Sequence, residues 1–257
     1  MEYVLICLTA LVASGLTFFS GFGLGTILLP AFALFFPVEM AVAMTAIVHF
    51  TNNLFKVVLI GRHVEKTVAL RFGMPAILAS FIGAWTLLWL HGMQPLLTYQ
   101  AWGIEHQIMP VKFVIAFLIL LFGFFEILPK FAAISIDRRY LPLGGVISGF
   151  FGGLSGHQGA LRSAFLIKAG LSKEAFIATG VVIACFVDVS RIAVYSSHFT
   201  LDVLKDHLLF LIAATLSAFV GATIGNKLVK KITLGGIQIV VSVMLIVIAV
   251  GLGLGII

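Results

Sequence analysis

Long apolar runs with almost no charged residues constrain the fold of this chain more than any other feature. A helix that spans a bilayer needs about 20 apolar residues. Six runs meet this requirement: Met40–Ile60, Val68–Leu90, Val111–Leu128, Ala175–Tyr195, His207–Lys227 and Leu234–Ile257. The runs are unbroken and do not alternate with polar residues as β-barrel strands do. They predict an all-α, polytopic membrane helix bundle.

The composition excludes other classes of protein. Of the 257 residues, 61% are hydrophobic and only 10% are charged. A soluble domain of this length could not cover so much apolar surface. This rules out a soluble globular protein, a disordered chain and, despite the net charge of +6, a nucleic-acid binder. The lipid bilayer is therefore the expected partner.

Two further apolar stretches are interrupted by residues that break helices. Tyr3–Phe36 contains Pro30 and several glycines, and Tyr140–Gly170 is richer still in glycine. We expect each stretch to form either two short helices that meet near the middle of the membrane or two tightly turned spans. Close helix packing is the alternative role of these glycines.

The basic residues indicate an orientation. Basic loops collect on the cytoplasmic side of a membrane protein. One threading places eleven of the sixteen basic residues there: Arg62, Lys66, Arg71, Lys130, Arg138, Arg139, Lys168, Lys173, Lys227, Lys230 and Lys231. It predicts a multi-pass protein of the cytoplasmic membrane with both termini outside.

The two halves of the chain resemble each other. Ser20–Gly21, Glu39, Asn53 and Lys56 recur 135 residues later as Ser155–Gly156, Glu174, Asp188 and Arg191. We expect a single transmembrane transporter domain over residues 1–257, with repeats at about 1–130 and 140–257. Each repeat has about five segments and begins with short broken helices. Because five is odd, the repeats should be inverted, which is typical of secondary transporters with a midplane site.

Polar side chains within the apolar runs are the best indicators of a site, because charge inside a bilayer is costly. His49, Asn52, Asn53 and Lys56 share one helical face, although Lys56 is also near enough to the helix end to snorkel to the interface. Asp188 and Arg191 lie one turn apart. Asp188 can pair with Arg191, with Lys56 or with Arg162, or it can carry a coupling proton.

The sequence S-G-H-Q-G-A-L-R-S at 155–163 is the most informative segment. A helix that starts after this break would direct its free N–H groups and positive dipole end toward a ligand. Arg162 adds a planar fork of donors suited to oxyanions. A polar interface that joins helices is the alternative. The residues expected to bind substrate are Thr26, Asn52, Asn53, Lys56, His157, Gln158, Arg162, Ser163 and Arg191, and Asp188 and His157 are the candidates for coupling.

Basic residues within the apolar runs outnumber acidic ones: the basic residues are Lys56, Arg162 and Arg191, and the acidic residue is Asp188. This surplus favours a small anionic substrate. The two cysteines and seven histidines form no metal-binding or nucleophilic pattern. We therefore expect no metal, no cofactor and no enzymatic activity. A homodimer is a candidate assembly.

The motifs S-G-F-G-L-G-T-I-L-L-P at 20–30 and G-F-F-G-G-L-S-G-H-Q-G at 149–159 resemble the sulfite exporter family TauE/SafE. A polar T-N-N segment at 51–53 adds to the resemblance, which covers nearly the whole chain. It implies a bacterial permease that exports sulfite or a related sulfur-containing organic anion, working here by alternating access. The alternative is an anion channel or an importer of another small anion. The second motif departs from the family pattern, since Phe165 stands opposite Pro30.

Overall fold

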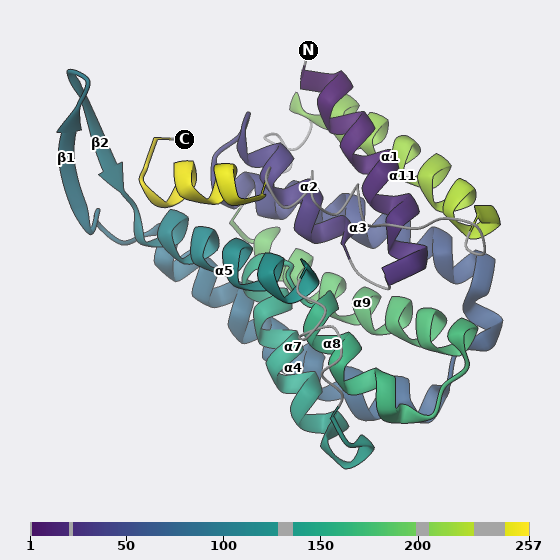
Figure 1. The fold of residues 1–257 in the computed structure, drawn as a ribbon. Helices are drawn as coiled ribbons and strands as arrows, with labels where there is room; N and C mark the ends of the chain where they lie inside the picture. Colours follow the sequence, from purple (N-terminus) through teal and green to yellow (C-terminus); the bar gives the residue numbers. More distant parts are fainter. Residues whose placement is uncertain (1, 21–22, 128–135, 199–205, 229–244, 257) are drawn as a thin grey trace.

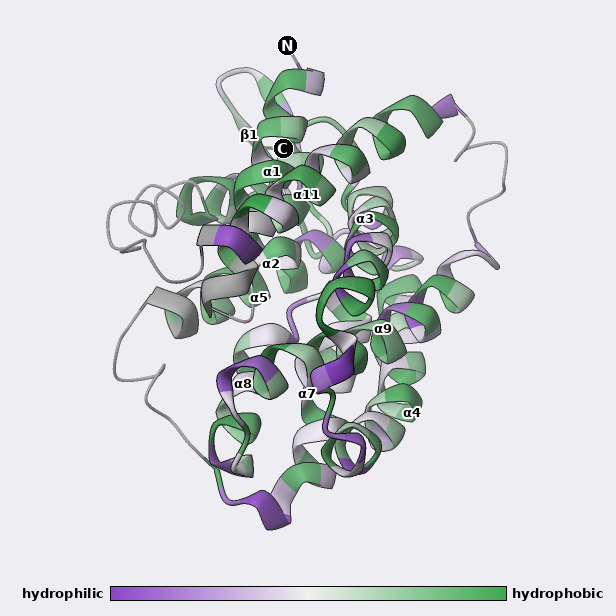
Figure 2. Ribbon diagram, turned by 90° about the vertical axis from the view of Figure 1, so that its right-hand side faces the viewer, coloured by the Kyte–Doolittle hydropathy of each residue, from purple (hydrophilic) through white to green (hydrophobic). Residues whose placement is uncertain are grey.

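The structure is a computed structural model that describes residues 2–20, 23–127, 136–198, 206–228 and 245–256. Within these ranges, four helices are long and apolar enough to cross a membrane, and they confirm four of the predicted runs. These helices are α3 (Val38–Ile60), α4 (Lys66–His91), α9 (Lys173–Tyr195) and α11 (Leu208–Leu228). Figure 2 shows hydrophobic colour along most of their length.

Shorter elements fill the rest of the bundle. Shorter helices occur at α1 (Glu2–Ser20), α2 (Leu24–Ala33), α5 (Pro110–Ile127), α7 (Leu141–Ser155) and α8 (Gly159–Leu166), and residues 245–253 are also helical. Single 3₁₀ turns lie at η1 (Gly61–His63), η2 (Arg138–Tyr140) and η3 (Ile167–Ala169).

The helices pack in pairs from distant parts of the chain. In Figure 1, α3 and α9 contact each other in the middle of the molecule, α1 lies along α11, and α4 lies along α7. The two ends of α9 lie 135 residues after the two ends of α3, which is the offset of the sequence repeat. The two central helices, α3 and α9, thus come from different halves of the chain.

Glycines allow the outer pairs to approach closely. On α7, Gly145, Gly149 and Gly153 recur every four residues on one face. A Cβ atom at these positions would overlap the backbone of three residues of α4, namely Phe72, Ala76 and Ser80. Gly221 and Gly225 of α11 meet the backbone of α1 in the same way. Small residues at four-residue spacing are typical of helix contacts in membranes, so the packing role proposed for glycine holds here.

Other glycines break the helices where the sequence predicted. Gly156 ends α7 with φ of 82°, and Gly23 precedes α2 with φ of 124°. Residues with a side chain rarely adopt these conformations. The two breaks also meet, since a Cβ on Gly25 would lie 3.1 Å from the carbonyl oxygen of Gly156. The broken helices of the two halves therefore converge.

Two details of the sequence prediction were wrong. The predicted all-α fold contains a β-hairpin between α4 and α5, in which β1 (Leu97–Ala101) pairs antiparallel with β2 (Ile104–Ile108). In addition, the sequence analysis placed Lys66 and Arg71 in the loop before the second run, but α4 already begins at Lys66, where the Glu65 side chain caps the helix by accepting from Val68 N at 2.6 Å. Lys66 and Arg71 therefore lie within α4 and not in the preceding loop.

Several predictions fall on residues outside the described ranges. Gly21, Lys130, Lys230, Lys231 and half of the run Leu234–Ile257 are among them. In Figure 1, the hairpin and both ends of the described chain lie on the upper side of the molecule.

The glycine contacts between α4 and α7 give the first prediction. Gly149→Ala should lower the melting temperature of the detergent-purified protein by several degrees, because overpacking a tight contact costs about 1–3 kcal/mol. Gly92→Ala is the matched control, since its φ is −76° and a Cβ there meets only atoms 3.7 Å away or farther. Equal melting temperatures for the two variants would contradict the packing described here.

Candidate functional site

The residues predicted to form a site are all buried, although they come from four helices and one helix break. Each is at most 7% exposed. Thr26 lies on α2, the two asparagines and Lys56 lie on α3, and Asp188 and Arg191 lie on α9. Arg162 and Ser163 lie on α8, and His157 and Gln158 fall between α7 and α8.

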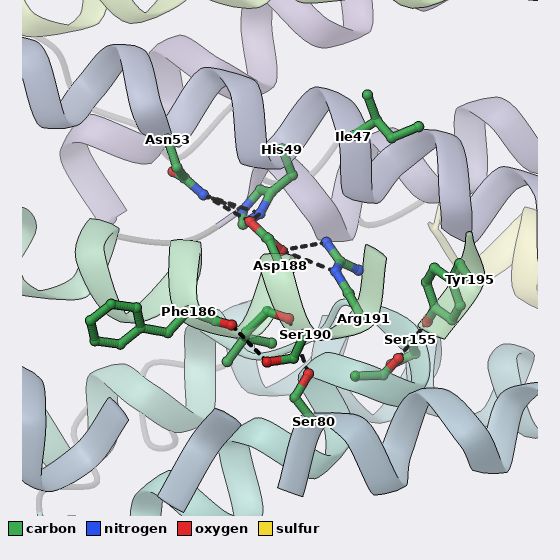
Figure 3. Close-up of polar contacts among 12 residues, drawn as sticks. Ile47, His49, Asn53, Ser80, Ser155, Phe186, Asp188, Ser190, Arg191 and Tyr195 are labelled. Carbon is green, nitrogen blue, oxygen red and sulfur yellow. Dashed lines mark hydrogen bonds and ion pairs between the residues drawn. The ribbon is translucent and has the colours of Figure 1, made fainter. Parts of the chain in front are cut away.

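Asp188 is the centre of a charged cluster between α3 and α9 (Figure 3). Its Oδ1 lies 2.7 Å from Arg191 Nη2 and 3.0 Å from Arg191 Nε. Its Oδ2 lies 2.7 Å from His49 Nδ1 on the opposite helix, and Asn53 Nδ2 donates to the same oxygen at 3.4 Å. Of the partners left open by the sequence, Arg191 is therefore the one that binds. His49 is a second partner that the sequence analysis had not assigned.

A second polar group on α3 surrounds Lys56. Lys56 is only 1% exposed, so it does not snorkel to the interface. The hydrogen-bonding geometry orients the Asn52 amide with its oxygen 3.2 Å from Lys56 Nζ and its nitrogen 3.2 Å from the carbonyl oxygen of Ala218. The hydroxyl of Ser14 on α1 also contacts this amide. Asn52 thus joins α1, α3 and α11 and orients the ammonium group.

The break between α7 and α8 carries polar atoms with no protein partner. In the described part of the chain, neither amide atom of Gln158 makes a hydrogen bond, and neither does Nε2 of His157, although both side chains are at most 2% exposed. The backbone here is well held, because Ser148 Oγ donates to the carbonyl oxygen of Gln158 at 3.0 Å. Buried polar groups in proteins are nearly always satisfied, so these unsatisfied groups make the break a candidate for a ligand site.

Arg191 reaches this break, and Arg162 lies in the first turn of the helix that follows it. A Cβ on Gly156 would lie 2.6 Å from Arg191 Nη1, so the absence of a side chain at Gly156 makes room for the guanidinium group. Gly180 of α9 makes room for Arg162 in the same way, at 3.3 Å from Nε. Arg162 is also close enough to Lys56 for their charges to interact. The cations from three helices therefore face one region.

The remaining predicted residues are less directly connected. Thr26 is buried on α2 next to Gly25, which meets the break. Ser163 follows Arg162 directly on α8, so its side chain points about 100° away around the helix. The sequence analysis did not single out Ser14, Cys185 or Tyr195, whose hydroxyl donates to the carbonyl oxygen of Gly153. The contacts of Ser14 and Tyr195 join residues 38 and 42 positions apart. The only sequence signal for these residues is a polar atom isolated in an apolar run.

Helices long and apolar enough to span a membrane, together with buried charged residues near a helix break, are typical of a polytopic membrane protein of the permease type. The family model of the sulfite exporter TauE/SafE matches residues 6–252, and the chain therefore belongs to this family. Membership implies a membrane permease for a small anionic substrate. The comparisons with curated proteins and with solved structures found no match.

The cluster around Asp188 gives a prediction of stability. Asp188→Ala should lower the free energy of unfolding by about 3–5 kcal/mol, because it leaves the buried charge of Arg191 without its carboxylate. Glu39→Gln is the control. Glu39 contacts His91 at 3.4 Å near the surface, where an ion pair contributes at most about 1 kcal/mol. Thermal unfolding in detergent measures the loss of stability in both variants. Equal losses would contradict a structural role for the buried pair of Asp188 and Arg191.

Proposed function

We propose that this protein is a secondary transporter that exports a small sulfur-containing oxyanion, sulfite or an organosulfonate, by alternating access. The observation that carries the proposal is the charge of the buried site. Within the described residues, three cations (Lys56, Arg162 and Arg191) are buried with one carboxylate, Asp188. Such a surplus of positive charge in an apolar bundle is stabilised by an anion, and the polar atoms without partners at the break supply directed donors.

The proposed ligand site lies at the break between α7 and α8. The first N–H groups of α8 have no partner within their own helix, and the positive end of its dipole is directed at the break. Gln158 Nε2 and His157 Nε2 can each donate to an oxyanion oxygen. Arg162 offers the planar guanidinium fork that matches two oxygens of a sulfite or sulfonate group. Arg191 adds Nη1, because its Nε and Nη2 already hold Asp188. Lys56, held by Asn52, adds a point charge.

Two contacts support an inverted repeat around this site. Asn53 and Asp188, which are equivalent residues at an offset of 135, contact each other at 3.4 Å. A contact between equivalent residues is expected next to a two-fold axis, as in any isologous contact. The outer helix pairs follow the same symmetry. The first helix of each half, α1 or α7, packs on a late helix of the other half, α11 or α4. In our proposal, the halves rock about the axis and expose the anion to each side in turn.

The direction and orientation complete the proposal. We take the exporting direction from the activity that the family is named for, and we assign the cytoplasmic side from the basic loops. Both ends of the described chain and the hairpin share one side of the molecule in Figure 1, in agreement with termini and a hairpin that all face outward. The whole of residues 1–257 then acts as a single transport domain.

Gln158 provides the sharpest test of the ligand site. Because its amide has no partner within the described protein, Gln158→Leu should leave the melting temperature of the ligand-free protein unchanged or slightly higher. Sulfite should stabilise the wild-type protein against heat by mass action, and the variant should lose most of this stabilisation. The measurement is a thermal shift across sulfite, methanesulfonate, sulfate and chloride at constant ionic strength.

The matched control is Gln94→Leu, the same substitution at an exposed position before β1. It should keep the full stabilisation by sulfite. If no sulfur oxyanion stabilises the wild-type protein more than chloride does, the proposed substrate class is wrong. If Gln158→Leu responds to sulfite as the wild type does, the site lies elsewhere.

A further inference from the structure

Arg191 is shared between two groups that compete for it. One edge of its guanidinium group, Nε and Nη2, holds Asp188 Oδ1. Its other nitrogen, Nη1, is next to Gly156 at the helix break and makes no hydrogen bond within the described part of the chain. The same side chain therefore neutralises the one buried carboxylate of the described residues and faces the proposed anion site.

The second partner of Asp188 can carry a proton. His49 approaches from α3, and its Nδ1 is 2.7 Å from Asp188 Oδ2 (Figure 3). A proton between these two atoms can be held by either group without a change in the fold. Asn53 Nδ2 donates to the same carboxylate oxygen and also lies 3.1 Å from His49 Nδ1, which fixes both side chains in place.

We propose that Asp188 and His49 together bind one proton when the site binds its anion, and that the anion and the proton cross the membrane together. This inference rests on the anion site proposed above. An anion at the break draws the charge of Arg191 toward itself, and Asp188 is then less neutralised. A buried carboxylate that loses its cation is costly to keep ionised, so the Asp188–His49 pair takes up a proton.

The proton balance follows from this exchange. The proton comes from water on the side to which the site is open, and it is released on the other side when the anion leaves and Arg191 again neutralises Asp188. A monovalent anion then crosses with no net charge. Arg191 is the switch in this scheme, and Asp188 and His49 are the coupling residues. His157, the other coupling candidate from the sequence, becomes a ligand donor.

The other groups that face the pair favour this arrangement. Lys56 on α3 and Arg162 on α8 are cations near the pair, and Cys185 and Tyr195 are the other titratable groups of α9 within range. His157 approaches Arg191 from the break. From α4, Ser80 contributes a hydroxyl that donates to the carbonyl oxygen of Val187 at 3.1 Å. Asp188 is thus the only carboxylate buried among these groups in the described chain.

Calorimetry of anion binding tests the proposal. Binding of sulfite to the full chain in detergent is measured in buffers with different ionisation enthalpies, and the protonation of sulfite itself is subtracted. Methanesulfonate, which does not titrate near neutral pH, is the second probe. The wild-type protein should take up about one proton per anion bound. Asp188→Asn should bind an anion with no proton uptake, and Glu39→Gln should behave as the wild type.

The outcomes separate this inference from the proposed function. Anion binding to the wild-type protein without proton uptake would overturn the coupling and leave the anion site standing. An absence of binding by both probes would overturn the proposed function itself. If Asp188→Asn does not fold, the proposal is tested by the pH dependence of anion binding to the wild-type protein. Its dissociation constant for methanesulfonate should rise up to tenfold per pH unit above the titration of the pair, and a flat profile from pH 5 to 9 would contradict the proposal.

Discussion

A charged side chain inside an apolar helix bundle needs a partner, and this requirement governs the arrangement of the central helices. Asp188 meets it by binding Arg191 on its own helix and His49 on α3. The contact at 2.7 Å between α3 and α9 places the two halves of the chain in register at the centre of the molecule. Loss of the carboxylate would leave a cation in a region from which water is largely excluded.

Glycine has two separate functions around this centre. Glycines with ordinary helical geometry, such as Gly149 and Gly153, allow backbones to touch, and they join α7 to α4 without any polar contact. Glycines with positive φ, Gly23 and Gly156, end helices and create the breaks. The first group gives a rigid outer frame, and the second leaves polar atoms of Gln158 and His157 inside it. In the proposed function, this rigid frame holds the polar atoms of the break in place for the anion.

Much of this architecture could be predicted from the sequence, because hydropathy and helix breakers act locally. The runs at Met40–Ile60 and Ala175–Tyr195 gave α3 and α9 to within two residues at each end. Spacing alone placed His49 and Asn53 on one face. The partner of His49 could not be predicted, because it lies 139 residues away and many pairings fit the same pattern. The hairpin after α4 was missed because the connection carries no asparagine–glycine or similar turn signal, and Trp102 takes the positive φ there. Which glycines pack and which break a helix also depends on their neighbours in space.

The central claim is that a buried cationic site binds an anion and carries it across the membrane by exposing it to each side in turn. Counterflow tests this most directly. Proteoliposomes loaded with unlabelled sulfite are diluted into a trace of labelled sulfite, with protein-free vesicles as the control. A carrier that alternates around one site predicts that the label accumulates transiently inside above its outside concentration. Uptake that never exceeds the equilibrium level, or that equals uptake by protein-free vesicles, would contradict this account.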